Sequence, residues 1–594
     1  MGSSHSRPRS RSSQNAHSNP IPDSVGALYF VDHHQWRLHR RLRLSSRKTT
    51  KGPTRQREGK QTKRCKRNDG GGVVHEEQLA PLAPELRTWP WWSFAALWVA
   101  INVNPATFSI TASLFASGFT FAEVLASIIF GTLVTNVALL ANSHAGAKYG
   151  IPFAVYARSA FGCEGAKLAA ASRGVIAVLW LSFQMWQGAY AFIMGLNALV
   201  PGANTWINLW PPNILSLGQL LSFAGVAIIH AALVIYGLFR FSKVPMFVLA
   251  AICSIGLIGL WIWSIQNLGV VNFNKAANDL LRSSNAQPID RDNPGWVILV
   301  VLKGTNVIVS NWSTMILNMS DISRYAKTQR AQMIGQTVGI NLSMLVTALA
   351  GVAGSIASVH VGAPAPVWQI VELFVYWQPA WAFVGGLLVL IAVINVNVYA
   401  NIIPPAFDFY NVAPQHLGFR VCALFSIAVA FAACPYALFT TASNFAFRFL
   451  AGYGVVTGAL FGVMVTHYYA VKRTNLNMST LYPPGYLDED PAEEPDASTV
   501  HMTSPIPCYH VCTTGHCWQA IVALLCGILL PGIGWIMSFI PSATKSSYFA
   551  VFSIFDDVSW LLSATISSLV YLACSWRHIK LCGKWKTQQE EDGI

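Results

Sequence analysis

Long apolar runs separated by short polar segments dominate the chain from residue 91 onward. A run of about 20 apolar residues with few charges is long enough to cross the hydrocarbon core of a bilayer as an α-helix. The chain has about twelve such runs, and they cover residues 91–115, 121–142, 171–199, 214–238, 243–266, 295–317, 333–358, 379–403, 417–434, 445–470, 517–540 and 547–576. The pattern predicts an all-α integral membrane protein with about 12 transmembrane helices.

The composition agrees with a membrane protein and excludes an ordinary soluble one. Only 11% of the 594 residues are charged and 53% are hydrophobic, whereas soluble domains carry roughly 25% charged residues. The expected surroundings are therefore a lipid bilayer. The formal net charge of +14 is accounted for by basic loops and a basic N-terminal tail, so it does not indicate binding to nucleic acid.

Basic residues are distributed unevenly between alternate loops. If the N-terminus is cytosolic, the loops on that side carry residues such as Lys148, Arg240, Arg324 and Lys472, whereas residues 198–216 on the other side contain no Lys or Arg. Loops rich in Lys and Arg normally stay in the cytosol. We therefore expect a multi-pass protein with both termini in the cytosol. We expect the plasma membrane as its location, with an organelle envelope as the alternative.

Changes in composition divide the chain into five regions. Residues 1–80 are rich in Arg, Ser and Lys and show no apolar periodicity, so we expect a disordered basic cytosolic tail, with an organellar transit peptide as the alternative. We expect residues 82–470 to form a ten-helix core and residues 471–516 to form a polar cytosolic loop. Helices 11 and 12 follow at 517–576, and residues 577–594 form a cytosolic C-terminal tail.

Cysteine and histidine gather near the end of the polar loop. The members of this group are Cys508, His510, Cys512, His516 and Cys517. Both residue types bind zinc, but this spacing matches no zinc-finger pattern. We therefore predict no metal site, and no motif indicates a cofactor.

Two apolar segments carry polar interruptions that a plain span would lack. The first contains INVNPATFS, with Asn102, Asn104 and Pro105, and the sixth contains Gly304, Asn306, Asn311 and Asn318. Proline removes a backbone donor, and irregular backbone at membrane depth is tolerated where it lines a cavity. These segments hold the same place in two five-helix units. The sequence therefore predicts a 5+5 inverted repeat with broken helices 1 and 6, and with substrate and ion near the membrane midplane.

Primary amides lie inside the third and eighth apolar segments. Trp180 and Gln184 are four residues apart and share a helix face, as do Asn397 and Asn401, with Asn395 nearby. An amide at this depth needs a partner, which is either another helix or a substrate. Convergence of several amides from pseudo-equivalent segments favours a polar substrate site.

Three stretches of the chain resemble the nucleobase:cation symporter family one. They begin at Asn142 (NSHAGAKYGIPFAVYARSAFG), Asn306 (NVIVSNWSTMILNMSDISRYAK) and Ile394 (INVNVYANIIPPAFDF). The likeness runs from about Leu82 to about Pro541, and YGIPF followed in order by NxxDxxRYAK is its most specific part. Members of this family carry hydantoins, allantoin, nucleobases and related compounds. The resemblance implies a transporter with the leucine-transporter-like fold plus two further helices.

The resemblance also implies which residues bind the substrate. In the family, the substrate ring lies between tryptophans of the third and sixth segments, and its polar edge meets amides of the third and eighth. These positions fall here on Trp180, Trp312, Gln184 and Asn401. Two indoles can stack on both faces of a planar ring, and amides match the alternating N–H and C=O edge of a ureide or pyrimidine.

Two further asparagines complete the predicted substrate-binding set. Asn104 lies at the break in the first segment, and Asn311 stands beside Trp312 where many family members have a small residue. The larger side chain narrows or re-aims the site. Neutral amides suit a neutral ligand, so amino-acid and amine substrates are disfavoured.

A cation site implied by the resemblance is degenerate in this chain. Sodium-coupled relatives hold the ion between carbonyls of the first helix and hydroxyls of a Ser-Thr pair on the eighth. The residues of this region are Ile101, Asn104, Ala392, Asn395 and Val396, with the last two at the Ser-Thr positions. Sodium is a hard cation that wants several oxygens, and Val396 offers only its main chain. We expect H+ rather than Na+ as the coupling cation, with Na+ as the alternative and Glu123 and Asp408 as candidate proton carriers.

Charged residues follow the sixth segment. Asp321 and Arg324 form a salt-bridge gate on the cytosolic side in one interpretation, and in the other this is an ordinary basic cytosolic loop.

The sequence favours a secondary active transporter that imports a planar nitrogenous heterocycle or ureide by cation symport. No GxxxxGK[ST] phosphate-binding loop is present, which argues against a pump driven by ATP. The alternatives are a substrate-sensing receptor on a transporter scaffold and a sodium-coupled or thiamine-type permease. We do not expect an enzyme, because no apolar segment presents a nucleophile with a base or histidines spaced for a metal.

Overall fold

The computed structural model describes residues 79–203, 216–237, 243–268, 293–414, 416–433, 444–482, 515–540 and 547–591. In this part of the chain all regular structure is helical, and the single β-bridge joins Trp89 to Ala326. Among the described residues, ten helices are long and apolar enough to cross a membrane. A bent pair of helices and the shorter apolar helix Phe419–Ala433 (α13) bring the number to that of the predicted segments, which confirms the all-α membrane fold.

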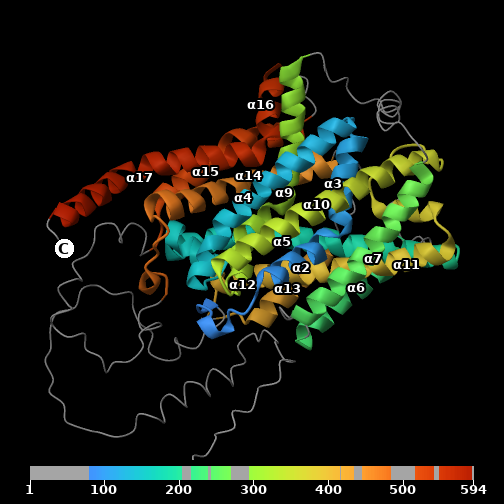
Figure 1. Ribbon diagram of the computed structural model, residues 1–594, viewed down its shortest axis with the longest axis horizontal. Helices are drawn as coiled ribbons and strands as arrows, with labels where there is room; N and C mark the ends of the chain where they lie inside the picture. Colours follow the sequence, from blue (N-terminus) through green and yellow to red (C-terminus); the bar gives the residue numbers. More distant parts are fainter. Residues whose placement is uncertain are drawn as a thin grey trace, which may run out of the picture.

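The helices follow the apolar runs closely. Most of the long ones lie roughly along the long axis of the molecule (Figure 1). The α-helices are α2 (Trp91–Asn102), α3 (Pro105–Ala116), α4 (Phe121–Tyr149), α5 (Phe153–Leu199), α6 (Leu217–Ile235), α7 (Lys243–Leu268), α9 (Pro294–Ser323), α10 (Gln329–His360), α11 (Pro379–Val396), α12 (Ile403–Val412), α13 (Phe419–Ala433), α14 (Ala451–Thr466), α15 (Trp518–Met537), α16 (Ser547–Asp557) and α17 (Ser559–Glu591). Short 3-10 helices are η2 (Pro84–Leu86), η4 (Ile370–Tyr376) and η9 (Met478–Thr480), and π-helical segments are η5 (Asn397–Ile402), η7 (Asn444–Leu450) and η8 (His467–Val471).

The first span is broken, as the sequence predicts. Helices α2 and α3 meet at an angle of 59°. Pro105 is the first residue of α3, where its missing N–H costs nothing. Asn104 precedes it in an extended conformation and caps the new helix.

The structure differs from the prediction at the sixth span, because α9 is α-helical throughout Pro294–Ser323. It contains no internal proline that would remove a hydrogen bond. Asn306, one of the residues behind the prediction, uses its side chain elsewhere: its Oδ1 accepts from the main-chain N–H of Trp560 at 2.9 Å. Its amide therefore caps α17 instead of interrupting α9.

An irregularity that the sequence analysis did not predict lies in the eighth span. The π-helical segment η5 separates α11 from α12. Pro404 and Pro405 follow it after one residue, Ile403, and neither proline can donate a hydrogen bond to the carbonyl four residues earlier. The wider π-turn carries Asn397 and Asn401, and such turns occur often at functional sites.

Helix α5 lies at the centre of the packing. It spans 47 residues with a kink at Gly162, whose φ of 79° suits glycine. It packs against α6, α9, α13 and the run from α11 through η5 to α12. Helices α14, α15 and α17 form a second group and lie against one another (Figure 1).

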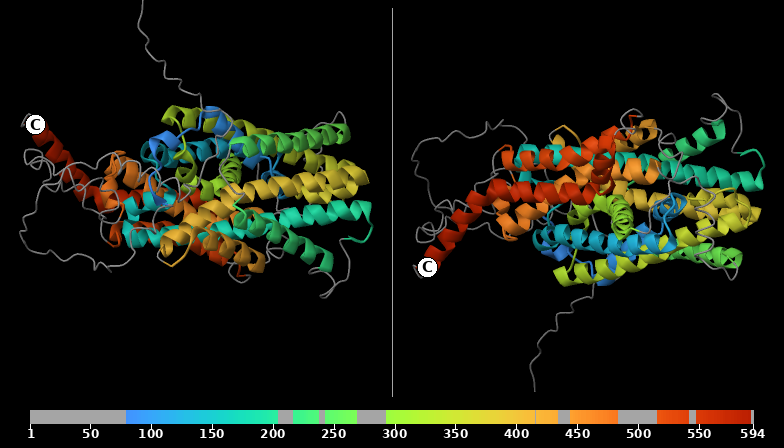
Figure 2. Two further views of the ribbon diagram at one scale, coloured as in Figure 1. Left: turned by 90° about the horizontal axis from the view of Figure 1, so that it is seen from below. Right: turned by 90° about the horizontal axis from the view of Figure 1, so that it is seen from above.

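Several predictions fall outside the described residues. These are the basic tail up to residue 78 and residues 483–514 of the polar loop, which include Cys508, His510 and Cys512. At the other end, α17 continues as a helix from the last span through most of the predicted tail, to Glu591. Figure 2 shows this last part of α17 projecting beyond the helix bundle.

Candidate substrate site

Gln184 is the most informative side chain of the site. It lies on α5 and is 2% exposed. Its Oε1 is buried and has no hydrogen-bond partner in the described part of the chain. A buried polar atom without a partner costs about 1–3 kcal/mol, so this amide is suited to a ligand that supplies the missing bond.

Trp180 lies one helical turn before Gln184, and other aromatic rings fix its orientation. It makes edge contacts with Phe449 at 5.5 Å and with Tyr453 at 6.2 Å between ring centroids. The hydroxyl of Tyr453 donates to the carbonyl of Ser310 at 2.7 Å. Tyr453 therefore connects Trp180 on α5 with α9, two residues before Trp312.

Trp312 is buried on α9 and rests edge-on against Trp98 of α2, with ring centroids 5.5 Å apart. Asn311 is buried beside it. Among the described residues no ring contact joins Trp312 to Trp180 directly.

Asn401 completes the set from η5, which packs against α5. It is 4% exposed, and its Nδ2 donates to Asn397 Oδ1 at 2.9 Å. The predicted aromatic and amide residues thus lie on α5, α9 and η5, and α5 packs against both of the other elements.

The structure gives Asn104 a different role from the predicted substrate contact. Its Oδ1 accepts from the main-chain N–H groups of Ala106 at 2.7 Å and Thr107 at 3.2 Å, and its Nδ2 donates to the carbonyl of Ile101. The amide is therefore used locally as the N-cap of α3. Asparagine is well suited to this position because the break exposes main-chain donors.

The predicted cation site is crossed by amide hydrogen bonds. Asn395 Nδ2 donates to the carbonyl of Ala100 at 2.7 Å, which joins α11 to the last turns of α2. The carbonyl of Ile101 already accepts from Asn104. Val396 is buried, and Ala392 packs against Val103. Two N–H groups thus occupy main-chain oxygens at the break, where a cation would need free oxygens.

On the predicted cytosolic side, Asp321 and Arg324 have separate partners. The main-chain N–H of Phe153 donates to Asp321 Oδ1 at 2.7 Å, so the carboxylate caps α5. The guanidinium of Arg324 lies over the rings of Tyr325 and Phe407, at 5.3 and 5.2 Å. No ion pair joins Asp321 to Arg324 among the described residues.

A buried ion pair lies between Arg173 of α5 and Asp408 of α12. Arg173 also lies over the ring of Phe153, at 5.6 Å. Asp408, a candidate proton carrier in the sequence, is thus the partner of a fixed cation. The other candidate, Glu123, forms a capping box with Thr120 at the start of α4.

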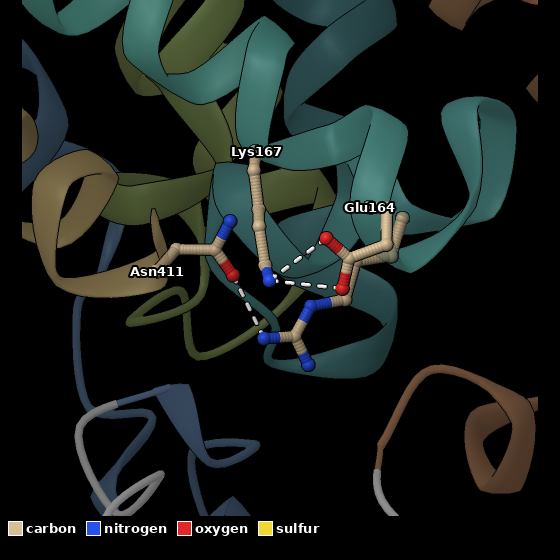
Figure 3. A network of polar contacts seen from close by, with 4 residues as sticks. Glu164, Lys167 and Asn411 are labelled. Atoms are coloured by element: carbon tan, nitrogen blue, oxygen red, sulfur yellow. Dashed lines mark hydrogen bonds and ion pairs between the residues drawn. The ribbon is translucent and has the colours of Figure 1, made fainter. Parts of the chain in front are cut away.

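A second polar cluster ties the loop after η8 to the predicted cytosolic end of α5. Arg158 donates to the carbonyl of Leu481 at 2.9 Å and to Asn411 Oδ1 at 2.7 Å. Figure 3 shows the bond that Asn411 accepts, and also Lys167, which donates to both carboxylate oxygens of Glu164 at 2.9 Å. The polar loop is therefore anchored to the core where the structure describes it.

Two features of the site were missed in the sequence analysis. One is His230, buried on α6 and in contact with Asn397; the signal was a single histidine inside the apolar run GVAIIHAALVI. The other is a chain of polar contacts in which Gln187 Nε2 donates to Gln369 Oε1 at 3.3 Å and Gln369 Nε2 donates to Glu372 Oε1 at 3.2 Å. Burial raises the pKa of Glu372, on the loop helix η4, to about 6.

Comparison with known proteins identifies relatives over most of the chain. Residues 81–486 match the family described as permeases for cytosine/purines, uracil, thiamine and allantoin. The allantoin permease of Bacillus subtilis is 28% identical over 84% of this chain and 92% of its own length. A putative allantoin permease of Escherichia coli is 27% identical over 69% of this chain and 82% of its own length.

Solved structures show the same fold. Mhp1, described as a nucleobase-cation-symport-1 family transporter, in a closed conformation with bromovinylhydantoin bound, superposes with a TM-score of 0.60 at 19% identity, over 84% of this chain and 95% of that one. The inward-facing conformation of Mhp1 gives a TM-score of 0.59 at 19% identity, over 86% of this chain and 93% of that one. These similarities confirm the leucine-transporter-like architecture predicted from the sequence.

Proposed function

This chain belongs to the nucleobase:cation symporter family one, and we propose that it imports a planar nitrogenous heterocycle or ureide by proton-coupled symport. The observation that carries the proposal is the buried, unpartnered amide oxygen of Gln184, one helical turn from Trp180. A ring with N–H groups at its edge satisfies that oxygen while its face stacks on the indole.

The polarity of the site supports a neutral substrate. Its predicted binding residues are two tryptophans and neutral amides, with no carboxylate or guanidinium to neutralise a charged ligand. The relatives named above include allantoin permeases of two bacteria, so allantoin and uracil are the first substrates to test. A thiamine-type ligand carries a positive charge and fits this set of side chains less well.

The main-chain oxygens at the break in the first span support proton coupling over sodium coupling. The carbonyls of Ala100 and Ile101 accept from Asn395 and Asn104, and Val396 supplies no hydroxyl. A proton does not need this cage of oxygens. Glu372, whose pKa is raised to about 6 by burial, titrates in a range where external acidity can act on it.

The distribution of Lys and Arg supports cytosolic termini, and import from outside the cell favours the plasma membrane. Expression with a C-terminal fluorescent tag, combined with protease accessibility of the tag, tests both statements.

Uptake by purified protein in proteoliposomes tests the function itself. Labelled allantoin and labelled uracil are offered with an inward proton gradient, with sodium replaced by choline. We expect uptake above the level of empty liposomes, collapse of accumulation with a protonophore, and exchange of internal labelled substrate for external unlabelled substrate. Binding without uptake or exchange would favour a substrate-sensing receptor, and absence of binding for every ring in a nucleobase and ureide panel would contradict the substrate class.

A further inference from the structure

His230 lies at the end of a chain of hydrogen bonds that reaches the candidate substrate site. It is fully buried on α6, in a stretch that is otherwise apolar. Its Nδ1 lies 2.8 Å from the carbonyl of Val226, on the preceding turn of the same helix. Its Nε2 lies 3.3 Å from Asn397 Nδ2 on η5.

The direction of these bonds follows from the groups that can only accept. The carbonyl of Val226 has no hydrogen, so His230 Nδ1 must carry the proton. In neutral imidazole the other nitrogen is then an acceptor, and Asn397 must turn its NH2 group toward it. This leaves Asn397 Oδ1 to accept from Asn401 Nδ2 at 2.9 Å. The main-chain carbonyl of Val226 thus determines the orientation of two side-chain amides on another helix.

The last amide in this chain of hydrogen bonds, that of Asn401, keeps its oxygen available. Within the described residues Asn401 makes its side-chain hydrogen bond through Nδ2, and its Oδ1 has no partner. An isolated asparagine can exchange its O and N positions by rotating about χ2 by 180°, because the two ends have nearly the same shape. The bond to Asn397 removes this freedom. Asn401 is therefore held as a hydrogen-bond acceptor on its remaining face.

We propose that His230 is a positioning residue that selects ligands with an N–H group opposite Asn401. It acts through Asn397 and does not touch the substrate. The preferred substrates are imides and ureides, in which a ring N–H stands between carbonyls. Rings that have an unprotonated nitrogen at that position are disfavoured. The proposal rests on the proposed function and adds to it the group that the substrate must present to Asn401, namely an N–H donor.

Two pyrimidines of nearly the same shape provide the probe. Uracil has an N–H at the ring position where cytosine has an unprotonated nitrogen, and the neighbouring carbonyl of uracil is an amino group in cytosine. We expect uracil to inhibit uptake of labelled allantoin at least about ten times more effectively than cytosine, because a mismatch leaves buried polar groups unpaired.

Variants of His230 and Asn397 separate positioning from folding. His230→Leu removes the acceptor for Asn397, so Asn401 can turn its NH2 group to the ligand. We expect KM to rise about tenfold, the change for one lost hydrogen bond, with maximal rate and surface level retained. The preference for uracil over cytosine should fall toward one. His230→Gln retains an acceptor for Asn397. In this variant both KM and the preference for uracil over cytosine should stay within about threefold of the unmodified protein.

Asn397→Leu breaks the same chain in its middle. The effects of Asn397→Leu and His230→Leu on KM should not multiply in the double variant, because both changes remove the same hydrogen bond between these two residues. Ser222→Ala is the matched control: Ser222 lies on α6 and bonds the carbonyl of Ala189 at 2.8 Å, apart from this chain. It should leave the preference unchanged.

The outcomes distinguish this inference from the function on which it rests. Failure of the unmodified protein to transport any ring of the panel contradicts the proposed function. Normal uptake with a preference for cytosine, or with a preference that survives both His230→Leu and Asn397→Leu, overturns the role of His230. If His230→Leu fails to reach the membrane, Asn397→Leu gives the same test from the other side of the bond, because it removes the group that His230 holds in place.

Discussion

The side-chain amide of Asn395 on α11 donates a hydrogen bond to the carbonyl of Ala100 on α2 at 2.7 Å. This bond joins the eighth span to the first just before the first span breaks. It places an N–H donor at a position where the family resemblance predicts an oxygen ligand of a sodium site. Asn395 thus connects two parts of the fold, and the bond also bears on the choice of coupling ion.

The first prediction concerns this bond. Uptake by the unmodified protein should not change when sodium is replaced with choline at fixed pH and membrane potential. Asn395→Ser with Val396→Thr removes the amide donor and adds two hydroxyl oxygens, so uptake should gain sodium stimulation. Asn395→Ser alone serves as the control, because it leaves Val396 without a hydroxyl. Steep sodium stimulation of the unmodified protein would contradict proton coupling.

Trp312 should contribute to binding more than to folding. In Trp312→Ala we expect KM to rise at least about 30-fold, since truncating a stacked aromatic anchor costs about 2 kcal/mol or more. Trp312→Phe keeps part of the stacking, so its KM should lie between that of the unmodified protein and that of Trp312→Ala. Trp98→Phe controls for loss of the edge contact alone. An unchanged KM for Trp312→Ala at a normal surface level would remove this residue from the site.

Gln184 and Asn306 should respond differently to the same change. Gln184→Leu leaves ligand groups unpaired and should weaken binding by about 1–3 kcal/mol while the protein still folds. Asn306→Leu removes the acceptor for Trp560 N–H and should lower thermal stability and surface level instead. Melting curves and KM values for both variants check this contrast. A stability loss at Gln184 as large as that at Asn306 would favour a purely structural role for Gln184.

Glu372 gives a prediction for pH. Burial raises its pKa from 4.5 to about 6 in the folded protein, so the folded state holds this proton more tightly than the unfolded state. Its contribution to stability is present below pH 4.5 and is lost as the pH rises toward 6, by about 2 kcal/mol. Glu372→Gln should therefore raise the melting temperature at pH 7.5 and leave it nearly unchanged at pH 4.5. It should also flatten the change of uptake with external pH near 6.

The ion pair of Arg173 and Asp408 should be essential as a pair. Asp408→Asn leaves a buried guanidinium without its counter-charge, which costs about 3–5 kcal/mol. We expect little folded protein from Asp408→Asn or Arg173→Gln alone, and recovery of expression in the double variant. Fluorescence-detected gel filtration measures the folded fraction. Normal yields of both single variants would show that the pair is dispensable.

The sequence by itself determined the local features of this protein. Apolar run lengths predicted the spans, because about 20 residues of helix match a bilayer. Pro105 after Asn104 predicted the break between α2 and α3, and the spacing of Trp180 and Gln184 placed them on one face of α5. These properties depend on residues within one or two helical turns of each other, so helical periodicity is sufficient to predict them.

Only the tertiary structure decided which partner each buried polar group takes. Asn306 and Asn401 are both asparagines in apolar segments, yet Asn306 caps a helix that begins over 250 residues later, whereas Asn401 lies on η5 against α5. Arg173 and Asp408 are 235 positions apart in the chain, and His230 and Asn397 are 167 apart. Periodicity reports the face on which a side chain lies but not the helix that packs against that face. In a membrane, where every buried donor needs an acceptor, that packing decides whether an amide binds a ligand, caps a helix or orients another amide.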